Sequence, residues 1–90
     1  MLNAVNGVMP QMSRCYEQRA RRVPITGAVT VQWRVGLNGR PVGLEVSPQL
    51  STIGDRWMQR CVKNAANRMH FDPPPARISE QLTRSFSFNQ

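Results

Sequence analysis

Two segments of the chain alternate between hydrophobic and polar residues, the pattern of β-strands with one buried face. The first segment runs from Ala28 to Val35, and its larger hydrophobic positions are Val29, Val31, Trp33 and Val35. The second segment follows Pro41, and its hydrophobic positions on one face are Val42, Leu44 and Val46. Each segment therefore predicts a strand that buries one face against a core.

The dipeptide Asn38-Gly39 lies between these segments and predicts a two-residue turn, because both residues tolerate the positive φ angles of a type I′ turn. The predicted partners are then Val35 and Val42, Trp33 and Leu44, and Val31 and Val46. Every inward-facing residue meets another inward-facing residue in this register. A shift of one residue would remove the match, so the pattern predicts a single hairpin register.

Further along the chain, hydrophobic residues recur at helical spacing. The stripe consists of Trp57, Met58, Cys61, Val62, Ala65, Ala66 and Met69, and we expect both Trp57 and the strand residue Trp33 to lie in the core. Ser51 or Thr52 is the expected N-cap, with Asp55 in the first turn. The helix should end near Met69 or His70, because a run of three prolines follows and cannot continue it.

The N-terminal segment has a second helical stripe, formed by Val8, Met12, Cys15, Tyr16 and Arg19. Pro10 suits the first turn of a helix, so we expect a helix from about Pro10 to Arg22, ended by Pro24. Leu2 and Val5 extend the stripe backwards, but a helix that included them would be kinked at Pro10.

The segment LTRSFSFN, from Leu82 to Asn89, alternates again and predicts a third strand with Phe86 and Phe88 on one face. Two helices with one hydrophobic stripe each can cover one face of a three-stranded sheet. We therefore expect an α+β fold of order α-β-β-α-β, in which two helices cover one face of a three-stranded antiparallel sheet. The other face should stay in water, with Thr30, Gln32, Glu45, Ser85 and Ser87 on it.

Ninety residues make one small domain, residues 1–90 with a core of about residues 8–88. The formal net charge of +7 predicts a positive surface and a partner among nucleic acids, anionic membrane or cell-wall surfaces, and acidic proteins. The basic residues are scattered, and only Arg19, Arg21 and Arg22 form a cluster. We find no apolar run of about 18 residues and no signal-peptide pattern, so we expect a cytosolic protein or a fragment whose targeting segment lies upstream.

Cys15 and Cys61 are the two cysteines of the chain. A nucleophilic cysteine needs a base, and the single histidine, His70, lies at a predicted helix end. A structural metal site normally needs four ligands, and two cysteines and one histidine supply three at most. We therefore expect no enzymatic activity, no metal and no cofactor.

A disulfide between Cys15 and Cys61 fits the pattern better, because each cysteine lies on the hydrophobic stripe of its helix and both stripes face the same sheet. Such a bond would indicate an oxidising compartment such as the periplasm. Two free thiols in the core are the alternative.

Taken together, these elements resemble the C-terminal domain of TonB-family energy transducers. The segment GAVTVQWRVGLNGRPVGLEVS is similar to the family's strand and turn, and CVKNAANRMHFDPP is similar to the family's helix that ends in an aromatic residue followed by proline. The CYE motif, Cys15, Tyr16 and Glu17, together with Cys61 is most similar to a cysteine-bearing branch associated with gliding motility in myxobacteria. The resemblance covers about residues 8–88.

The resemblance implies a periplasmic domain of a longer protein that is anchored in the inner membrane and docks to an outer-membrane protein. Inner-membrane proton-driven motors power such transducers, in gliding motility or in transport, and the domain itself does no covalent chemistry. In the family the C-terminal strand is a sheet edge to which an extended segment of the partner adds as a further strand. Carried over to this chain, that edge consists of Thr83, Arg84, Ser85, Phe86, Ser87, Phe88 and Asn89.

The residues support this expectation, since the edge segment contains neither proline nor lysine to block strand addition. Attachment to anionic peptidoglycan is compatible with the same interpretation. A small basic nucleic-acid-binding domain is the alternative, because the charge is +7. We consider nucleic acid the weaker candidate, because no aromatic residue is interleaved with arginine on the predicted open face of the sheet.

Overall fold

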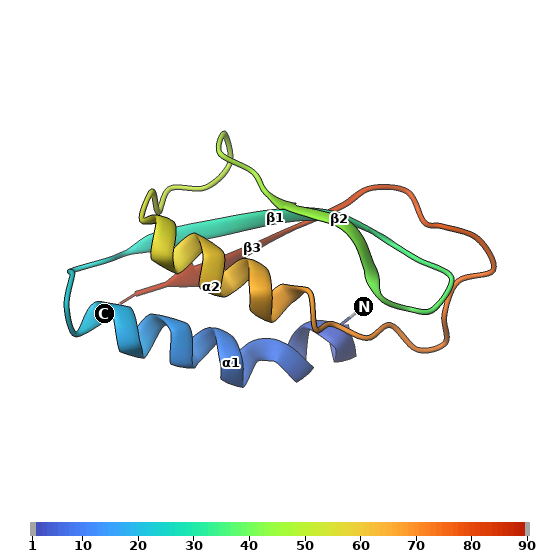
Figure 1. Ribbon diagram of the computed structural model, residues 1–90, viewed down its shortest axis with the longest axis horizontal. Helices are drawn as coiled ribbons and strands as arrows, with labels where there is room; N and C mark the ends of the chain where they lie inside the picture. Colours follow the sequence, from blue (N-terminus) through green and yellow to red (C-terminus); the bar gives the residue numbers. More distant parts are fainter. Residues whose placement is uncertain (1, 90) are drawn as a thin grey trace.

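The computed structural model describes residues 2–89 and contains two helices and three strands. In chain order these are α1 (Leu2–Ala20), β1 (Gly27–Val35), β2 (Pro41–Val46), α2 (Arg56–Ala66) and β3 (Leu82–Phe88). The strands form one antiparallel sheet in the order β2-β1-β3, and both helices lie on the same face of it (Figure 1). The α+β fold and the α-β-β-α-β order predicted from the sequence are confirmed.

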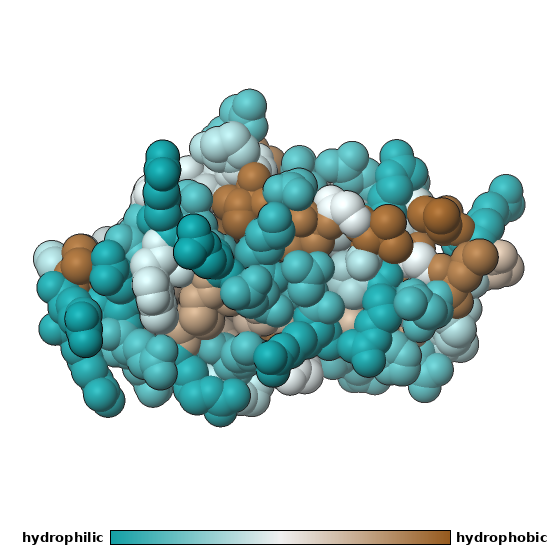
Figure 2. All heavy atoms as spheres, in the orientation of Figure 1, coloured by the Kyte–Doolittle hydropathy of each residue, from teal (hydrophilic) through white to brown (hydrophobic). Residues whose placement is uncertain are grey.

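The core lies between the sheet and the two helices. All four hydrophobic residues predicted to face inward from β1 are buried, namely Val29, Val31, Trp33 and Val35. The helices supply the opposite wall with Val5, Val8, Met12, Met58, Val62, Ala65 and Ala66, among others. Hydrophilic side chains cover most of the outer surface of the helical layer in the view of Figure 2. The domain is therefore two layers thick around one core.

Helix α1 is longer than predicted, because it begins at Leu2 and contains Pro10. Pro10 is exposed and removes one main-chain hydrogen bond from the helix. The first turns bury Ala4, Val5 and Val8, and this hydrophobic burial offsets the cost of the proline. The predicted start near Pro10 was therefore wrong, while the backward extension of the stripe is confirmed at Val5; the side chain of Leu2 lies outside the described part of the chain.

Helix α2 starts later and ends earlier than predicted. Its N-cap is Asp55, whose Oδ2 accepts a hydrogen bond from the Met58 N–H at 2.8 Å. The two residues predicted as caps bond to β1 instead: the side-chain oxygens of Ser51 and Thr52 accept hydrogen bonds from main-chain N–H groups of that strand. The helix ends at Ala66 rather than near Met69.

The turn between β1 and β2 has three residues rather than two. Gly36 donates its N–H to the Arg40 carbonyl at 2.8 Å, so Leu37, Asn38 and Gly39 form the loop. Gly39 has a φ of 78°, and no described residue other than glycine has a positive φ. A type I′ turn needs a positive φ at both central residues, so the predicted turn at Asn38-Gly39 was wrong.

The third loop residue shifts the register, and a β-bulge restores it. Beside the turn, Val35 pairs with Pro41 and Arg34 with Val42, so the predicted pair of Val35 and Val42 was wrong. The predicted pair of Trp33 and Leu44 is not a regular ladder pair, because the bulge places a second residue opposite Trp33. Gly43, with a φ of 62°, and Leu44 together stand opposite Trp33. The predicted pair of Val31 and Val46 follows. As a result Leu44 is 4% exposed, whereas Val42, predicted to face the core, is 46% exposed.

The second face of the sheet is only partly open. Ser85, Ser87 and Glu45 are exposed and Gln32 is half-buried, but Thr30, predicted to be in water, is 1% exposed. Two neighbours cover it: the Leu50 carbonyl of segment 47–53 lies 3.2 Å from the Thr30 hydroxyl, and the Ser85 hydroxyl of β3 lies 2.7 Å from it. Around Thr30, β1 is therefore buried on both faces.

Two glycine-to-alanine substitutions, one in the bulge and one in α1, should change the free energy of unfolding in opposite directions. Gly43→Ala should destabilise the fold by about 1 kcal/mol, because an L-residue at a left-handed φ is strained. Gly7→Ala lies in α1 and should stabilise by about 0.5–1 kcal/mol, since alanine favours helix. Apart from neighbouring residues and the backbone of the same helix, an added Cβ at either position meets no atom within 4 Å, so backbone conformation decides both results. Urea unfolding measures them, and equal shifts would contradict the bulge.

Candidate functional site

Strand β3 forms one edge of the sheet. It pairs with β1 along its whole length, from Leu82 opposite Trp33 to Phe88 opposite Gly27. On its other side no strand of the described residues pairs with it. The edge predicted to receive a partner strand therefore exists as a regular strand of seven residues.

Three residues of β3 direct their main-chain groups away from the sheet. Thr30 pairs with Ser85, yet its N–H donates to Ser51 Oγ at 2.9 Å and its carbonyl accepts from the Ser47 N–H at 2.8 Å, both on the far side of β1. Ser85 consequently exchanges no main-chain hydrogen bond with β1, and its N–H and carbonyl point outward. By the alternation of an antiparallel ladder, the same holds for Thr83 and Ser87.

The side chains of the predicted edge divide into two groups. Phe86 and Phe88 are buried, and the Phe88 ring stacks on Tyr16 of α1 with centroids 5.5 Å apart. The remaining members are exposed, and these are Thr83, Arg84, Ser85, Ser87 and Asn89, the last one residue beyond the strand. The phenylalanines thus anchor β3 to the core, while its outer edge is left to the solvent.

Arg84 adds a charge to this edge. It pairs with the buried Val31 and so shares the helix-side face of the sheet, yet its side chain is exposed. A charged residue on the core-facing side of an edge strand discourages edge-to-edge pairing between two copies of the same sheet. An acidic residue on an added strand would instead form a favourable pair with Arg84.

The other edge of the sheet is less suited to strand addition. Strand β2 has six residues, begins at Pro41, and is bent by the bulge at Gly43. Proline and bulges are the features by which proteins block sheet edges. Of the two edges, β3 is therefore the better template for an added strand.

The two helices are joined by a disulfide between Cys15 and Cys61, with Cα atoms 5.9 Å apart. The predicted pairing is confirmed, and the alternative of two free thiols is excluded. Cys15 is 1% exposed and Cys61 is half-buried, so the bond is largely shielded from solvent between the two helices. Closing a loop with a sequence separation of 46 stabilises a fold by about 4 kcal/mol on the chain-entropy estimate.

A salt bridge also links the two helices, and it was not predicted from the sequence. Arg19, in the last turn of α1, binds both carboxylate oxygens of Asp55, with Nε 3.0 Å from Oδ2 and Nη2 2.9 Å from Oδ1. The hydrogen bonds from Arg19 lower the pKa of Asp55, and the bond from the Met58 N–H acts in the same direction, although partial burial opposes both. One carboxylate thus caps α2 and ties it to α1.

Trp57 contradicts its predicted place in the core, because it is 42% exposed. It lies one position before Met58 and so about 100° around the helix from that buried residue. That angle is the signal in the sequence that places it at the rim. The Arg19 guanidinium carbon lies 5.8 Å from the centroid of the Trp57 ring.

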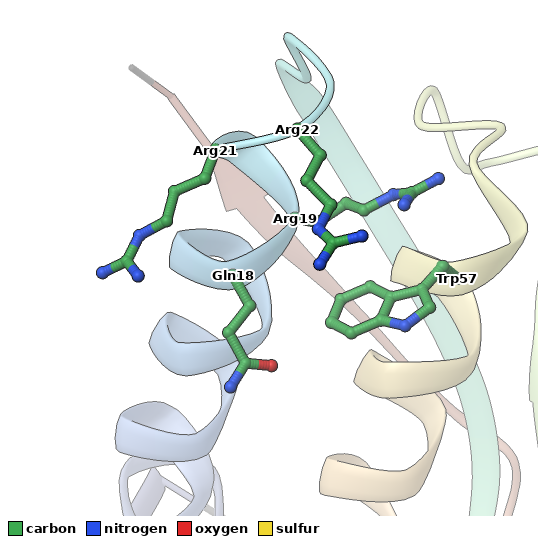
Figure 3. Close-up of a pocket in the computed structure, with 5 residues that line it drawn as sticks. All are labelled: Gln18, Arg19, Arg21, Arg22 and Trp57. Carbon is green, nitrogen blue, oxygen red and sulfur yellow. The ribbon is translucent and has the colours of Figure 1, made fainter.

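A pocket of about 460 Å³ opens beside this ring, between the C-terminal end of α1 and the first turn of α2. Its lining residues are Gln18, Arg19, Arg21, Arg22 and Trp57, drawn in Figure 3. The side chains of Arg19 and Arg22 extend from the end of α1 toward α2, which carries Trp57, whereas Arg21 points away from the Trp57 ring (Figure 3). The arginine cluster noted in the sequence therefore forms one wall of a pocket.

Within residues 2–89, no group of three or more histidine, cysteine, aspartate or glutamate side chains could hold a metal ion. Among these residues, neither helix is both long and apolar enough to cross a membrane. A scan against protein-family models gave no match, and searches of curated proteins and of solved structures gave none either. The TonB-like resemblance therefore stays a prediction.

The salt bridge between Arg19 and Asp55 predicts how the stability of the fold depends on pH. Because the pKa of Asp55 is lowered in the folded state, its ionised form stabilises the fold above the unfolded pKa of about 3.9. That stabilisation is lost as the pH falls through the folded pKa. Asp55→Asn keeps a good N-cap but removes the charge, so it should be less stable than the native chain near about pH 6 and equally stable in strong acid.

Urea unfolding at several pH values measures this difference. Glu80→Gln is the matched control, because it removes one acidic charge from an exposed loop position. A stability gap for Asp55→Asn that does not narrow in acid would contradict the role given to the carboxylate.

Proposed function

We propose that the chain is a non-enzymatic periplasmic interaction domain of a TonB-like energy transducer. It docks an outer-membrane protein, or a periplasmic segment of one, by adding a strand of that partner to β3. The observation that carries the proposal is the open edge of β3, with the main-chain groups of Thr83, Ser85 and Ser87 directed outward.

The position of β3 in the fold suits a strand that carries load. Strand addition gives affinity through main-chain hydrogen bonds and specificity through alternate side chains. Beneath the edge, Phe86 and Phe88 are packed in the core and hold β3 to it. On the outer side, the exposed Arg84 favours a partner strand with an acidic residue opposite it.

The disulfide supports the proposed compartment. Disulfides persist in oxidising environments such as the periplasm and are rare in the bacterial cytosol. The bond between Cys15 and Cys61 therefore favours a domain that works outside the inner membrane. Tethering to that membrane and coupling to a proton-driven motor, in gliding motility or transport, would come from a segment upstream of residue 1.

Nucleic-acid binding stays the alternative, motivated by the net charge of +7. The open face of the sheet presents Gln32, Glu45, Ser85 and Ser87, which offer no aromatic ring on which a base could stack. Peptidoglycan is a further anionic partner that the charge would suit, and it does not compete with strand addition.

An amide NMR titration with extended peptides from the periplasmic segments of outer-membrane proteins tests the proposal. We expect a binding peptide to shift the amides of Thr83, Ser85 and Ser87 most. Ser85→Pro should weaken that peptide at least about tenfold, because proline removes an outward N–H that the added strand would bond. Shifts confined to the two helices would refute strand addition.

Ser85→Ala is the matched control for Ser85→Pro. Alanine removes the hydroxyl that lies 2.7 Å from Thr30 Oγ1 but keeps the main-chain N–H. The peptide should therefore bind Ser85→Ala and the native chain equally well. If the two variants weakened binding to the same extent, the side chain and not the strand edge would be responsible.

A further inference from the structure

We infer a second binding site in this domain: the pocket between the end of α1 and the start of α2, which we propose binds an acidic peptide segment. This site goes beyond the proposed function, because it uses no atom of the β3 edge. Its parts are the arginines at the end of α1, the carboxamide of Gln18 and the exposed ring of Trp57.

The pocket has positive charge that the chain itself does not neutralise. Arg19 is bound by Asp55, but neither Arg21 nor Arg22 has a salt-bridge partner among residues 2–89. Both are exposed. Cations at the C-terminal end of a helix are favoured by the helix dipole, which explains why they lie there but leaves their hydrogen-bond donors unused.

One lining residue, Arg19, already shows how an arginine at this place holds a carboxylate. Asp55 receives two parallel hydrogen bonds from Arg19 at 2.9 and 3.0 Å, the fork geometry that arginine forms with carboxylates. In the view of Figure 3 the side chains of Arg22 and Arg19 both extend from the end of α1 toward α2, whereas Arg21 points the other way. The carboxylate of an incoming aspartate or glutamate would meet Arg22 there in the same kind of fork.

The other lining groups suit a peptide rather than a bare anion. The carboxamide of Gln18 has both donors and an acceptor, so it can bond the N–H and the carbonyl of a peptide backbone. The ring of Trp57, 42% exposed, offers an apolar surface for the aliphatic part of a side chain. A volume of about 460 Å³ is in the range of sites that bind small ligands.

The same features disfavour a nucleic-acid strand. Proteins that bind single strands stack successive bases on several aromatic residues along a basic groove. The lining of this pocket contains one ring, that of Trp57. A single carboxylate-bearing residue with its backbone fits the pocket better than a chain of nucleotides.

Fluorescence titration of the full chain with a capped hexaglutamate peptide tests the site. Trp33 is buried and Trp57 exposed, so a change in emission on binding reports on Trp57. Arg22→Gln should weaken the peptide about tenfold, the loss expected for a charge-assisted pair. Arg14→Gln is the matched control, because it removes one charge from an exposed position of α1 that does not line the pocket; it should weaken the peptide less than about twofold.

Three results would overturn the inference. If Arg22→Gln and Arg14→Gln weakened the hexaglutamate peptide equally, the peptide would be attracted by the net charge of the domain and not by the pocket. Equal affinity for capped hexaglutamine would mean that the carboxylates are not recognised. A single-stranded oligonucleotide of equal charge that bound more tightly, with the same loss in Arg22→Gln, would make the pocket a nucleic-acid site. Ser85→Pro should leave the affinity for hexaglutamate unchanged, so failure of this site and failure of strand addition can be told apart.

Discussion

The disulfide between Cys15 and Cys61 is the constraint on which the rest of this small domain depends. It joins the two helices covalently, and the pair of Arg19 and Asp55 joins them again where α1 ends and α2 begins. With both helices fixed beneath one face of the sheet, the core closes around Trp33, Met12 and Met58. A chain of 90 residues has little other surplus stability, so a bond worth about 4 kcal/mol is a large part of the whole.

This arrangement also determines which surfaces are left for partners. Because both helices cover the same face, neither protects the outer edge of β3, and segment 47–53 lies along β1 on the side opposite β3 and covers Thr30. The edge of β2 is blunted by Pro41 and the bulge at Gly43. What stays open is the edge of β3 and, at the end of the molecule where α1 stops and α2 starts, the pocket beside Trp57.

The sequence predicted the elements, their order and the inward face of β1, because each depends on a periodicity within one element. It predicted the disulfide because each cysteine lies on the hydrophobic stripe of its helix and both stripes face one sheet. It did not predict the three-residue loop or the bulge, since two compensating shifts leave the same alternating pattern on both strands. It misplaced Thr30 and the cap of α2 because both depend on segment 47–53, whose path is set by tertiary contacts. The pocket was missed because its arginines and Trp57 are far apart in sequence.

Native-state hydrogen exchange of the β3 amides tests the central claim, an uncovered sheet edge, most directly. Alternate amides should differ: those of Thr83, Ser85 and Ser87 should exchange at least about tenfold faster than those of Arg84, Phe86 and Phe88, which the ladder with β1 protects. Similar protection at all six positions would mean that the outer edge is already paired, and it would contradict the account.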